Sequence, residues 1–145
     1  MSLRSSIFLI VAAFALTIPG SRGQENLLSP ENAVAIARAV NTAEAEFLGQ
    51  SKHPVDLQSI RAHGLIQPLE SKIEIDWSAN PNSFSAKGYD VRLTLTNDQT
   101  QYTLTILPKP EQWKAGPCPP AFVTNESGVI FQGLAFGCES TSDAD

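Results

Sequence analysis

Apolar residues recur at three- and four-residue steps along SPENAVAIARAVNTAEAEFLGQ, the stretch from Ser29 to Gln50. The apolar positions are Ala33, Ile36, Ala37, Val40, Ala43, Phe47 and Leu48. The polar positions between them are Glu31, Arg38, Asn41, Glu44 and Glu46. This spacing predicts one long amphipathic helix whose apolar face packs on a core. Ser29 is the expected N-cap, and Gly49 is expected to end the helix in a left-handed conformation.

The pattern changes along the next part of the chain. A second, shorter helix is predicted at 55–62, with Gly64 as its stop. From Ser71 onward the period becomes two, which predicts strands at 72–77 (KIEIDW), 89–96 (YDVRLTLT) and 101–108 (QYTLTILP). The short NDQT sequence joins the last two strands as a hairpin, and 80–88 is expected to be a polar loop.

Prolines and glycines interrupt this pattern between Pro108 and Pro120, which therefore cannot be a central strand. The following AFVTNESGVIFQG predicts a strand, a turn at 125–128 and a second strand. The order of elements predicts an α+β fold, with one long N-terminal helix packed on a three- to four-stranded antiparallel sheet.

Length and charge limit the classes of function. A chain of 145 residues that is 42% hydrophobic and 17% charged is expected to form a single domain. Its formal net charge of -5 disfavours a nucleic-acid partner, because such binding depends on clustered lysine and arginine.

The first 23 residues have the pattern of a cleavable signal peptide. Arg4 precedes an apolar stretch at 7–18, Pro19-Gly20 breaks it, and small residues support cleavage after Gly23. An uncleaved anchor is the alternative, but at about 1.5 Å per residue the apolar stretch spans about 18 Å of a roughly 30 Å hydrocarbon core. We therefore expect a secreted or periplasmic protein with a signal peptide at 1–23, one domain at 24–139 and a disordered acidic tail at 140–145.

Export gives the two cysteines a structural role. Cys118 and Cys138 are predicted to form a disulfide, since a lone pair in an oxidising compartment is usually bonded. The bridge would close a loop of about 20 residues and contribute roughly 3 kcal/mol. A redox or metal pair is the alternative, but the sequence has no C-x-x-C.

Candidate catalytic and metal-binding residues are few. His53, His63 and Asp56 are a conceivable metal triad, but their spacing does not bring them together on one helix face, and lone surface histidines are common. Glu74, Asp76 and Asp90 are expected on solvated strand faces. No G-x-S-x-G, H-E-x-x-H or P-loop pattern occurs, and we predict no catalytic site, cofactor or metal.

Two aromatic residues, one shortly before each predicted disulfide cysteine, are candidates for a partner contact. Trp113 and Phe136, beside several prolines, form rigid apolar material of the kind found at interfaces. The alternative is that Trp113 covers one end of the core. The sequon at Asn125 is explained by the turn in which it lies.

The order of elements resembles the globular domain of type IV pilins and type II secretion pseudopilins. Two stretches strengthen the resemblance, ENAVAIARAVNTAEAEF in the helix and FVTNESGVIFQG in the closing hairpin. Unlike the pilin stretch, the apolar stretch here precedes the expected cleavage point and contains no acidic residue. The resemblance therefore implies a pilin-like fold without the polymerisation helix.

These observations predict a non-enzymatic interaction module of the cell envelope, whose partners are envelope or secretion-system proteins. No nucleic acid and no stable membrane anchor are expected after cleavage. The alternative is a small secreted enzyme or enzyme inhibitor on the same helix-on-sheet scaffold.

Overall fold

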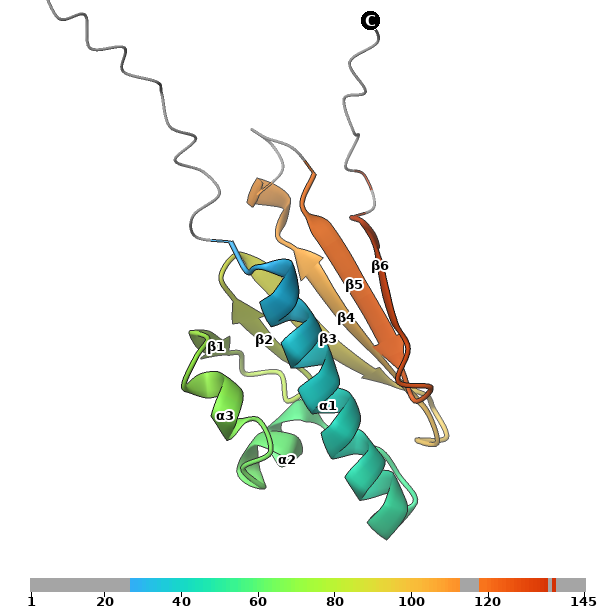
Figure 1. Cartoon of the computed structure of the whole chain (residues 1–145). Coiled ribbons are helices and arrows are strands. Elements are labelled where there is room, and N and C mark those ends of the chain that lie inside the picture. The colour runs from blue at the N-terminus through green and yellow to red at the C-terminus, as the bar shows by residue number, and fades with distance from the viewer. Residues whose placement is uncertain (1–26, 113–117, 136, 138–145) are drawn as a thin grey trace, which may run out of the picture.

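A six-stranded antiparallel sheet with helices packed on one face forms the part of the chain that the computed structural model describes, residues 27–112, 118–135 and 137 (Figure 1). The helices are α1 (Pro30–Ser51), α2 (Leu57–Ala62), α3 (Gln67–Glu70) and the 3₁₀ helix η1 (Pro110–Gln112). The strands are β1 (Ile75–Trp77), β2 (Ser83–Ala86), β3 (Tyr89–Leu95), β4 (Tyr102–Pro108), β5 (Pro120–Asn125) and β6 (Ile130–Leu134). The predicted α+β class is confirmed, but the sheet has more strands than the three or four expected.

Helix α1 begins where the sequence predicts and ends later. The backbone N–H of Asn32 donates to Ser29 Oγ over 3.2 Å, which confirms the N-cap. The expected stop at Gly49 is wrong, because the helix continues to Ser51 and Lys52 takes the left-handed conformation at φ 67°. Two bonds satisfy the last carbonyls at that point: the Lys52 N–H donates to Leu48 O, and Ser51 Oγ donates to Phe47 O.

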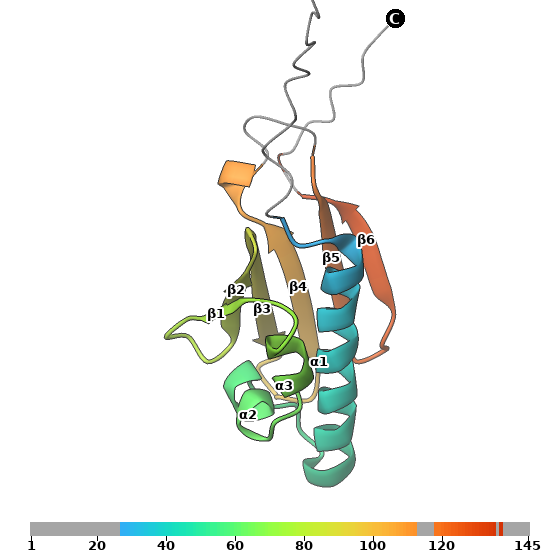
Figure 2. The same ribbon diagram turned by 60° about the vertical axis from the view of Figure 1, so that its left-hand side comes forward.

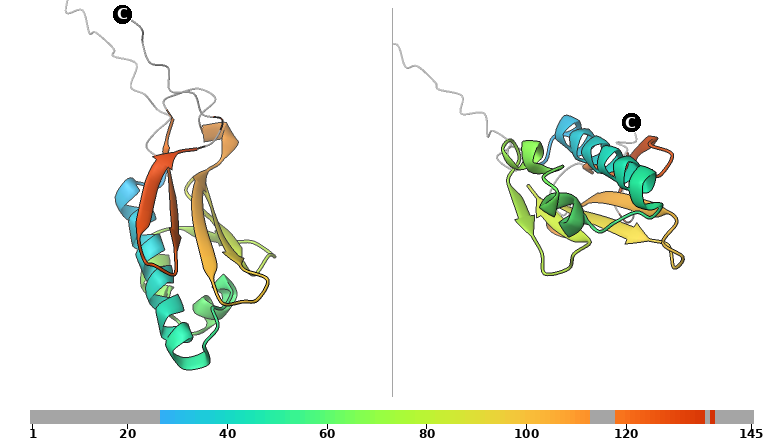
Figure 3. Two further views of the ribbon diagram at one scale, coloured as in Figure 1. Left: turned by 90° about the vertical axis from the view of Figure 1, so that its right-hand side faces the viewer. Right: turned by 90° about the horizontal axis from the view of Figure 1, so that it is seen from below.

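The predicted apolar face of α1 is confirmed over most of its length. Ala33, Ile36, Ala37, Val40 and Ala43 are all buried. Because most of these side chains are small, α1 lies directly across β4 and β5 (Figures 1 and 2). Figure 3 shows the opposite face of the sheet without a helix over it in the described residues.

Strand β2 replaces the polar loop predicted at 80–88. Phe84 and Ala86 are buried and alternate with half-buried serines, so the segment has one core face. Lys87 and Gly88, with φ of 42° and 78°, form a two-residue turn of the kind that joins tight hairpins. Strand β1 is shorter than predicted and pairs with β2, Trp77 opposite Phe84.

Two short helices close one side of the sheet. Asp56 is the N-cap of α2, and its Oδ1 accepts from the Ser59 N–H. Helix α3 was not predicted. Glu70 Oε1 accepts from Trp77 Nε1 at 2.7 Å and from Arg61 Nε at 2.9 Å. The Arg61 guanidinium also lies 4.7 Å from the Trp77 ring centroid. These contacts fix β1 against the helices.

The closing hairpin is confirmed. β5 and β6 pair in antiparallel register, and the Gly128 N–H donates to Asn125 O in the turn between them. Gly128 has a φ of 72°, which favours glycine. Asn125 Oδ1 accepts from the backbone N–H and the hydroxyl of Ser127, so the sequon asparagine is part of the turn structure.

One row of side chains crosses the whole sheet on its helix side. Successive registers align Trp77, Phe84, Val91, Ile106, Phe122 and Gln132. The row is apolar until it reaches β6, where Gln132 is exposed. The fully buried core therefore ends at β5, and β6 adds the half-buried Ile130 at its margin.

Several predicted features fall on residues outside the described ranges. They are the signal peptide at 1–23, the tail at 140–145, and the residues Trp113, Phe136 and Cys138. The Cys118–Cys138 disulfide remains a prediction for this reason, and no free cysteine occurs among the described residues. Within those residues, no helix has both the length and the apolar composition needed to cross a membrane.

Candidate functional site

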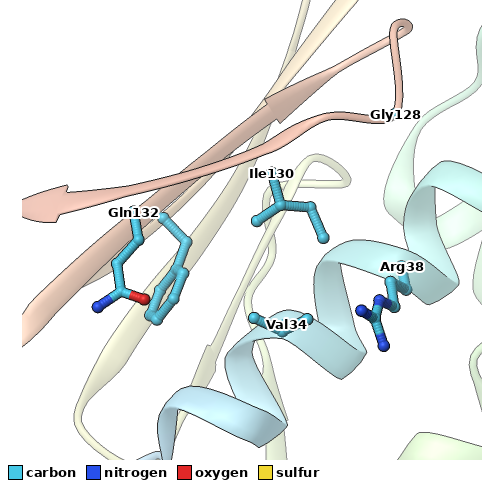
Figure 4. A pocket seen from close by; sticks show the side chains of 6 residues that line it. Val34, Arg38, Gly128, Ile130 and Gln132 are labelled. Atoms are coloured by element: carbon cyan, nitrogen blue, oxygen red, sulfur yellow. The ribbon is translucent and has the colours of Figure 1, made fainter.

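A groove of about 390 Å³ lies between helix α1 and strand β6 (Figure 4). It is lined by Val34, Arg38, Phe122, Gly128, Ile130 and Gln132. Val34 and Arg38 are four residues apart on α1, so they lie on the same side of the helix. Ile130 and Gln132 are two residues apart on β6 and therefore face the helix side of the sheet together.

The groove exists because α1 crosses β4 and β5 and leaves β6 without a covering helix. Ile130 is half-buried, and the rest of the strand is exposed. Phe131 is 62% exposed and Leu134 is 56% exposed. An apolar strand is thus open to solvent beside a concave surface.

The outer edge of β6 pairs with no other strand in the described part of the chain. Pro120, which has no N–H, is paired with Leu134, so this pair cannot be one of the hydrogen-bonded pairs of the β5–β6 ladder. Hydrogen-bonded pairs alternate with non-hydrogen-bonded pairs along an antiparallel ladder. The hydrogen-bonded pairs with β5 are therefore those of Phe131 and Gly133. It follows that the N–H and C=O groups of Ile130, Gln132 and Leu134 point to the open edge.

The two edges of the sheet differ in charge and covering. Strand β1 is flanked and interrupted by Glu74 and Asp76, and its Trp77 is bonded to α3. Strand β6 lies in a run without any charged residue, from Ser127 to Gly137. Because charged residues and coverings are the usual protection of an edge strand, β1 is protected, whereas none of the described residues protects β6 in this way.

Arg38 is the one charged residue in the lining of the groove. Its side chain is exposed, and in the described part of the chain it makes no ion pair. The ion pairs there are Arg61 with Glu70 and Lys109 with Asp90. The groove therefore combines three apolar side chains, Val34, Phe122 and Ile130, with the polar Gln132 and a cation without an ion-pair partner. Glu31 lines an adjoining hollow with Val34 and Arg38, but it makes no ion pair with Arg38 in the described residues.

A chain of hydrogen bonds fixes α1 on the sheet next to this groove. The hydroxyl of Tyr102 on β4 donates to Asn41 Oδ1 over 2.9 Å. Asn41 Nδ2 donates in turn to Thr124 Oγ1 on β5 over 2.8 Å. Asn41 was expected on the polar face of the helix, but it is half-buried and joins α1 to both strands.

The exchange Tyr102→Phe is expected to lower the free energy of unfolding by about 1–2 kcal/mol, because it leaves a half-buried amide oxygen of Asn41 without its donor. Tyr89→Phe is the matched control, since the Tyr89 hydroxyl makes no hydrogen bond to the residues that the structure describes. Urea unfolding of both variants measures the difference. Equal effects would show that the Tyr102–Asn41 bond adds no stability.

Glu44 lies at the same helix–sheet interface, and its predicted exposure is wrong. The side chain has no exposed surface. Its Oε2 accepts from the Val55 N–H at 3.0 Å, while Oε1 has no hydrogen-bond partner among the described residues. Burial raises the pKa of Glu44 to about 7, and the nearby carboxylate of Asp56 adds to this rise. Burial and the Glu44 charge also raise the pKa of Tyr102 to about 12.

The structure separates the three residues considered as a metal triad. His53 Nδ1 lies 3.2 Å from Gln99 O, His63 Nδ1 lies 2.8 Å from Ser59 O, and Asp56 caps α2. Among the described residues no group of three histidine, cysteine or acidic side chains could hold a metal ion.

The strand carboxylates Glu74, Asp76 and Asp90 are exposed, as predicted. Asp90 lines a second hollow of about 330 Å³ on the outer face, together with Arg92, Thr105, Leu107, Pro108, Pro110 and Ala135. Its carboxylate accepts from Ser85 Oγ at 2.9 Å and lies 3.6 Å from Lys109 Nζ. The described lining contains no second carboxylate and no histidine to act with it.

Sequence reasoning did not find the groove. It placed the candidate contact at Trp113 and Phe136, both outside the described ranges. The available signal was the uncharged run that begins at Ser127, which is unusual for an edge strand.

None of the protein-family models, curated proteins or solved structures compared with the chain matches it.

Proposed function

We propose that this chain is a non-enzymatic interaction module of the cell envelope that binds an extended segment of another protein as an additional strand beside β6. The observation behind this proposal is the open, uncharged edge of β6 next to the groove between α1 and β6. In such binding the backbone supplies the hydrogen bonds and the groove selects alternate side chains.

The backbone of β6 suits this role. Ile130, Gln132 and Leu134 offer donors and acceptors at the edge, and the groove lies on the same side as their side chains. The sheet is antiparallel throughout its described strands, so an added strand running opposite to β6 extends the existing pattern. Binding would also cover the exposed apolar side chains of the strand.

The cellular setting of the proposal comes from the sequence. The signal-peptide pattern at 1–23 and the predicted disulfide between Cys118 and Cys138 support an oxidising compartment outside the cytoplasm as the setting. A long helix on an antiparallel meander supports a pilin-like relation, with envelope or secretion-system proteins as partners. Filament formation is not part of the proposal.

The test uses a variant that blocks only the outer edge. Gln132→Pro removes an N–H that makes no bond to β5, whereas Gln132→Thr keeps it. The chain from Gln24 onward, in wild-type and both variant forms, is immobilised and exposed to envelope extract of its own host. A partner bound through β6 is expected to be retained by the wild type and Gln132→Thr, and to bind Gln132→Pro about tenfold more weakly.

Hydrogen exchange then locates the contact. The partner's binding segment should slow exchange at the amides of Ile130, Gln132 and Leu134. Urea unfolding must show that Gln132→Pro remains folded. Retention of the partner by Gln132→Pro, or unchanged exchange along β6, would contradict strand addition.

A further inference from the structure

We infer that the groove selects a segment with an apolar side chain followed two residues later by a carboxylate. This inference rests on the proposed strand addition at β6. It adds the chemistry of the partner, which comes from the positions of Val34 and Arg38.

The spacing of the two α1 residues matches the repeat of a strand. Val34 and Arg38 are separated by about 6 Å along the helix axis, from a rise of about 1.5 Å per residue. Alternate side chains of a strand are about 6.8 Å apart. An added strand can therefore place one inward side chain opposite Val34 and the next one opposite Arg38.

The chemistry of the two positions differs. Val34 and Ile130 form an apolar position, which favours a branched aliphatic side chain. Arg38 has no ion-pair partner in the described residues, and no acidic side chain lines the groove. A carboxylate on the bound segment would supply the missing charge, with a geometry that suits the guanidinium fork.

The order of the two side chains follows from the direction of the strand. Figure 4 shows Arg38 toward Gly128 and Val34 closer to Gln132. A strand antiparallel to β6 passes Gln132 before it passes Gly128. It therefore meets Val34 first and Arg38 second, which gives the order apolar, any residue, acidic.

The same charge argument disfavours a second copy of this chain. Two β6 strands paired edge to edge would bring only uncharged residues to the groove, because 127–137 contains no acidic side chain. Arg38 would remain without an ion-pair partner. A foreign segment with a carboxylate fits the site better.

The test uses short synthetic peptides of alternating threonine and serine with one central Val-Thr-Glu sequence. Three further peptides carry Val-Thr-Gln, Val-Thr-Lys or the reversed order Glu-Thr-Val. Fluorescence anisotropy measures their affinity for the chain from Gln24 onward at low salt. The Val-Thr-Glu peptide is expected to bind about fivefold more tightly than Val-Thr-Gln, the difference that one partly exposed ion pair makes.

Variants at Arg38 assign the preference to this residue. Arg38→Gln should bind the Glu and Gln peptides equally, and Arg38→Glu should prefer Val-Thr-Lys. Because Arg38 is exposed, both variants are expected to keep the fold, which urea unfolding checks. Added salt should reduce the preference of the wild type.

The outcomes separate the two proposals. Equal binding of the Glu and Gln peptides, with binding lost in Gln132→Pro, would overturn the carboxylate preference and leave strand addition in place. Binding that survives in Gln132→Pro would overturn strand addition. Failure of every peptide to bind would overturn the inferred segment. So would a wild-type chain that is a dimer while Gln132→Pro is a monomer, because β6 would then bind a second copy of the chain.

Discussion

Replacing Phe84 by alanine is expected to lower the free energy of unfolding by about 3–5 kcal/mol, the usual cost of truncating a buried phenylalanine. Phe84 is 1% exposed and is the one large apolar side chain of β2. Its ring lies 4.8 Å from the Trp77 ring, centroid to centroid, and pairs across the sheet with Val91. The alanine variant therefore loses contacts to both neighbouring strands.

Ser85→Ala is the matched control, one residue away on the opposite face of β2. Its hydroxyl donates to the exposed carboxylate of Asp90, so the expected change is about 0.5 kcal/mol. Urea unfolding followed by circular dichroism measures both variants. A Phe84→Ala variant as stable as Ser85→Ala would show that β1 and β2 are not part of the cooperative core.

Strand β2 also shows what local sequence signals miss. Ser83-Phe84-Ser85-Ala86 alternates correctly, but serine and alanine have little strand preference, so the segment resembles a polar loop. The Lys87-Gly88 turn is less distinctive than the asparagine-glycine pairs that mark hairpins. The segment forms a strand because it pairs with β1 and β3, and no signal within the segment itself predicts this pairing.

Periodicity predicted the long helix, its N-cap, and the hairpins β3–β4 and β5–β6, because those signals are local. The groove was not predictable in the same way. It depends on where α1 crosses the sheet, which is set by the small side chains on its face and by the bonds of Asn41 to Tyr102 and Thr124. The order of elements along the sequence does not specify that crossing point.

Glu44 shows a further limit of the polar and apolar pattern. It lies one residue after Ala43 and four after Val40, so the helix places it beside two buried positions. A glutamate there is more often turned to solvent, and the prediction followed that tendency. The connection between α1 and α2 makes Glu44 an exception, because the Val55 N–H donates to its buried carboxylate.

The burial of Glu44 makes the stability of the protein depend on pH. Its pKa is about 7 in the folded chain, against 4.5 for a solvated glutamate such as that of the unfolded chain. Between pH 4.5 and pH 7, the Glu44 carboxyl is therefore protonated in the folded state and ionised in the unfolded state. The contribution of Glu44 to stability is fully present below pH 4.5 and is lost as pH rises through 7, a change of about 3 kcal/mol.

The exchange Glu44→Gln is expected to remove this dependence. At pH 8 the variant should be more stable than the wild type by up to about 3 kcal/mol, because the wild type must bury a charge or take up a proton. At pH 4 the two should have similar stability, since a neutral amide and a protonated carboxyl each keep an acceptor for the Val55 N–H. Urea unfolding at intervals from pH 4 to pH 8 measures the difference.

The difference between variant and wild type isolates Glu44 from other titrating groups. Hydrogen bonds lower the pKa of Glu31 and Asp98, which gives stability that is lost as pH falls, in the opposite sense. Those contributions are common to both proteins and cancel. Glu46→Gln, an exposed change on the same helix that leaves Glu44 in place, should keep the pH dependence of the wild type. A constant stability difference between Glu44→Gln and the wild type at every pH would mean that the Glu44 carboxyl titrates normally, and that α1 does not bury it against the sheet.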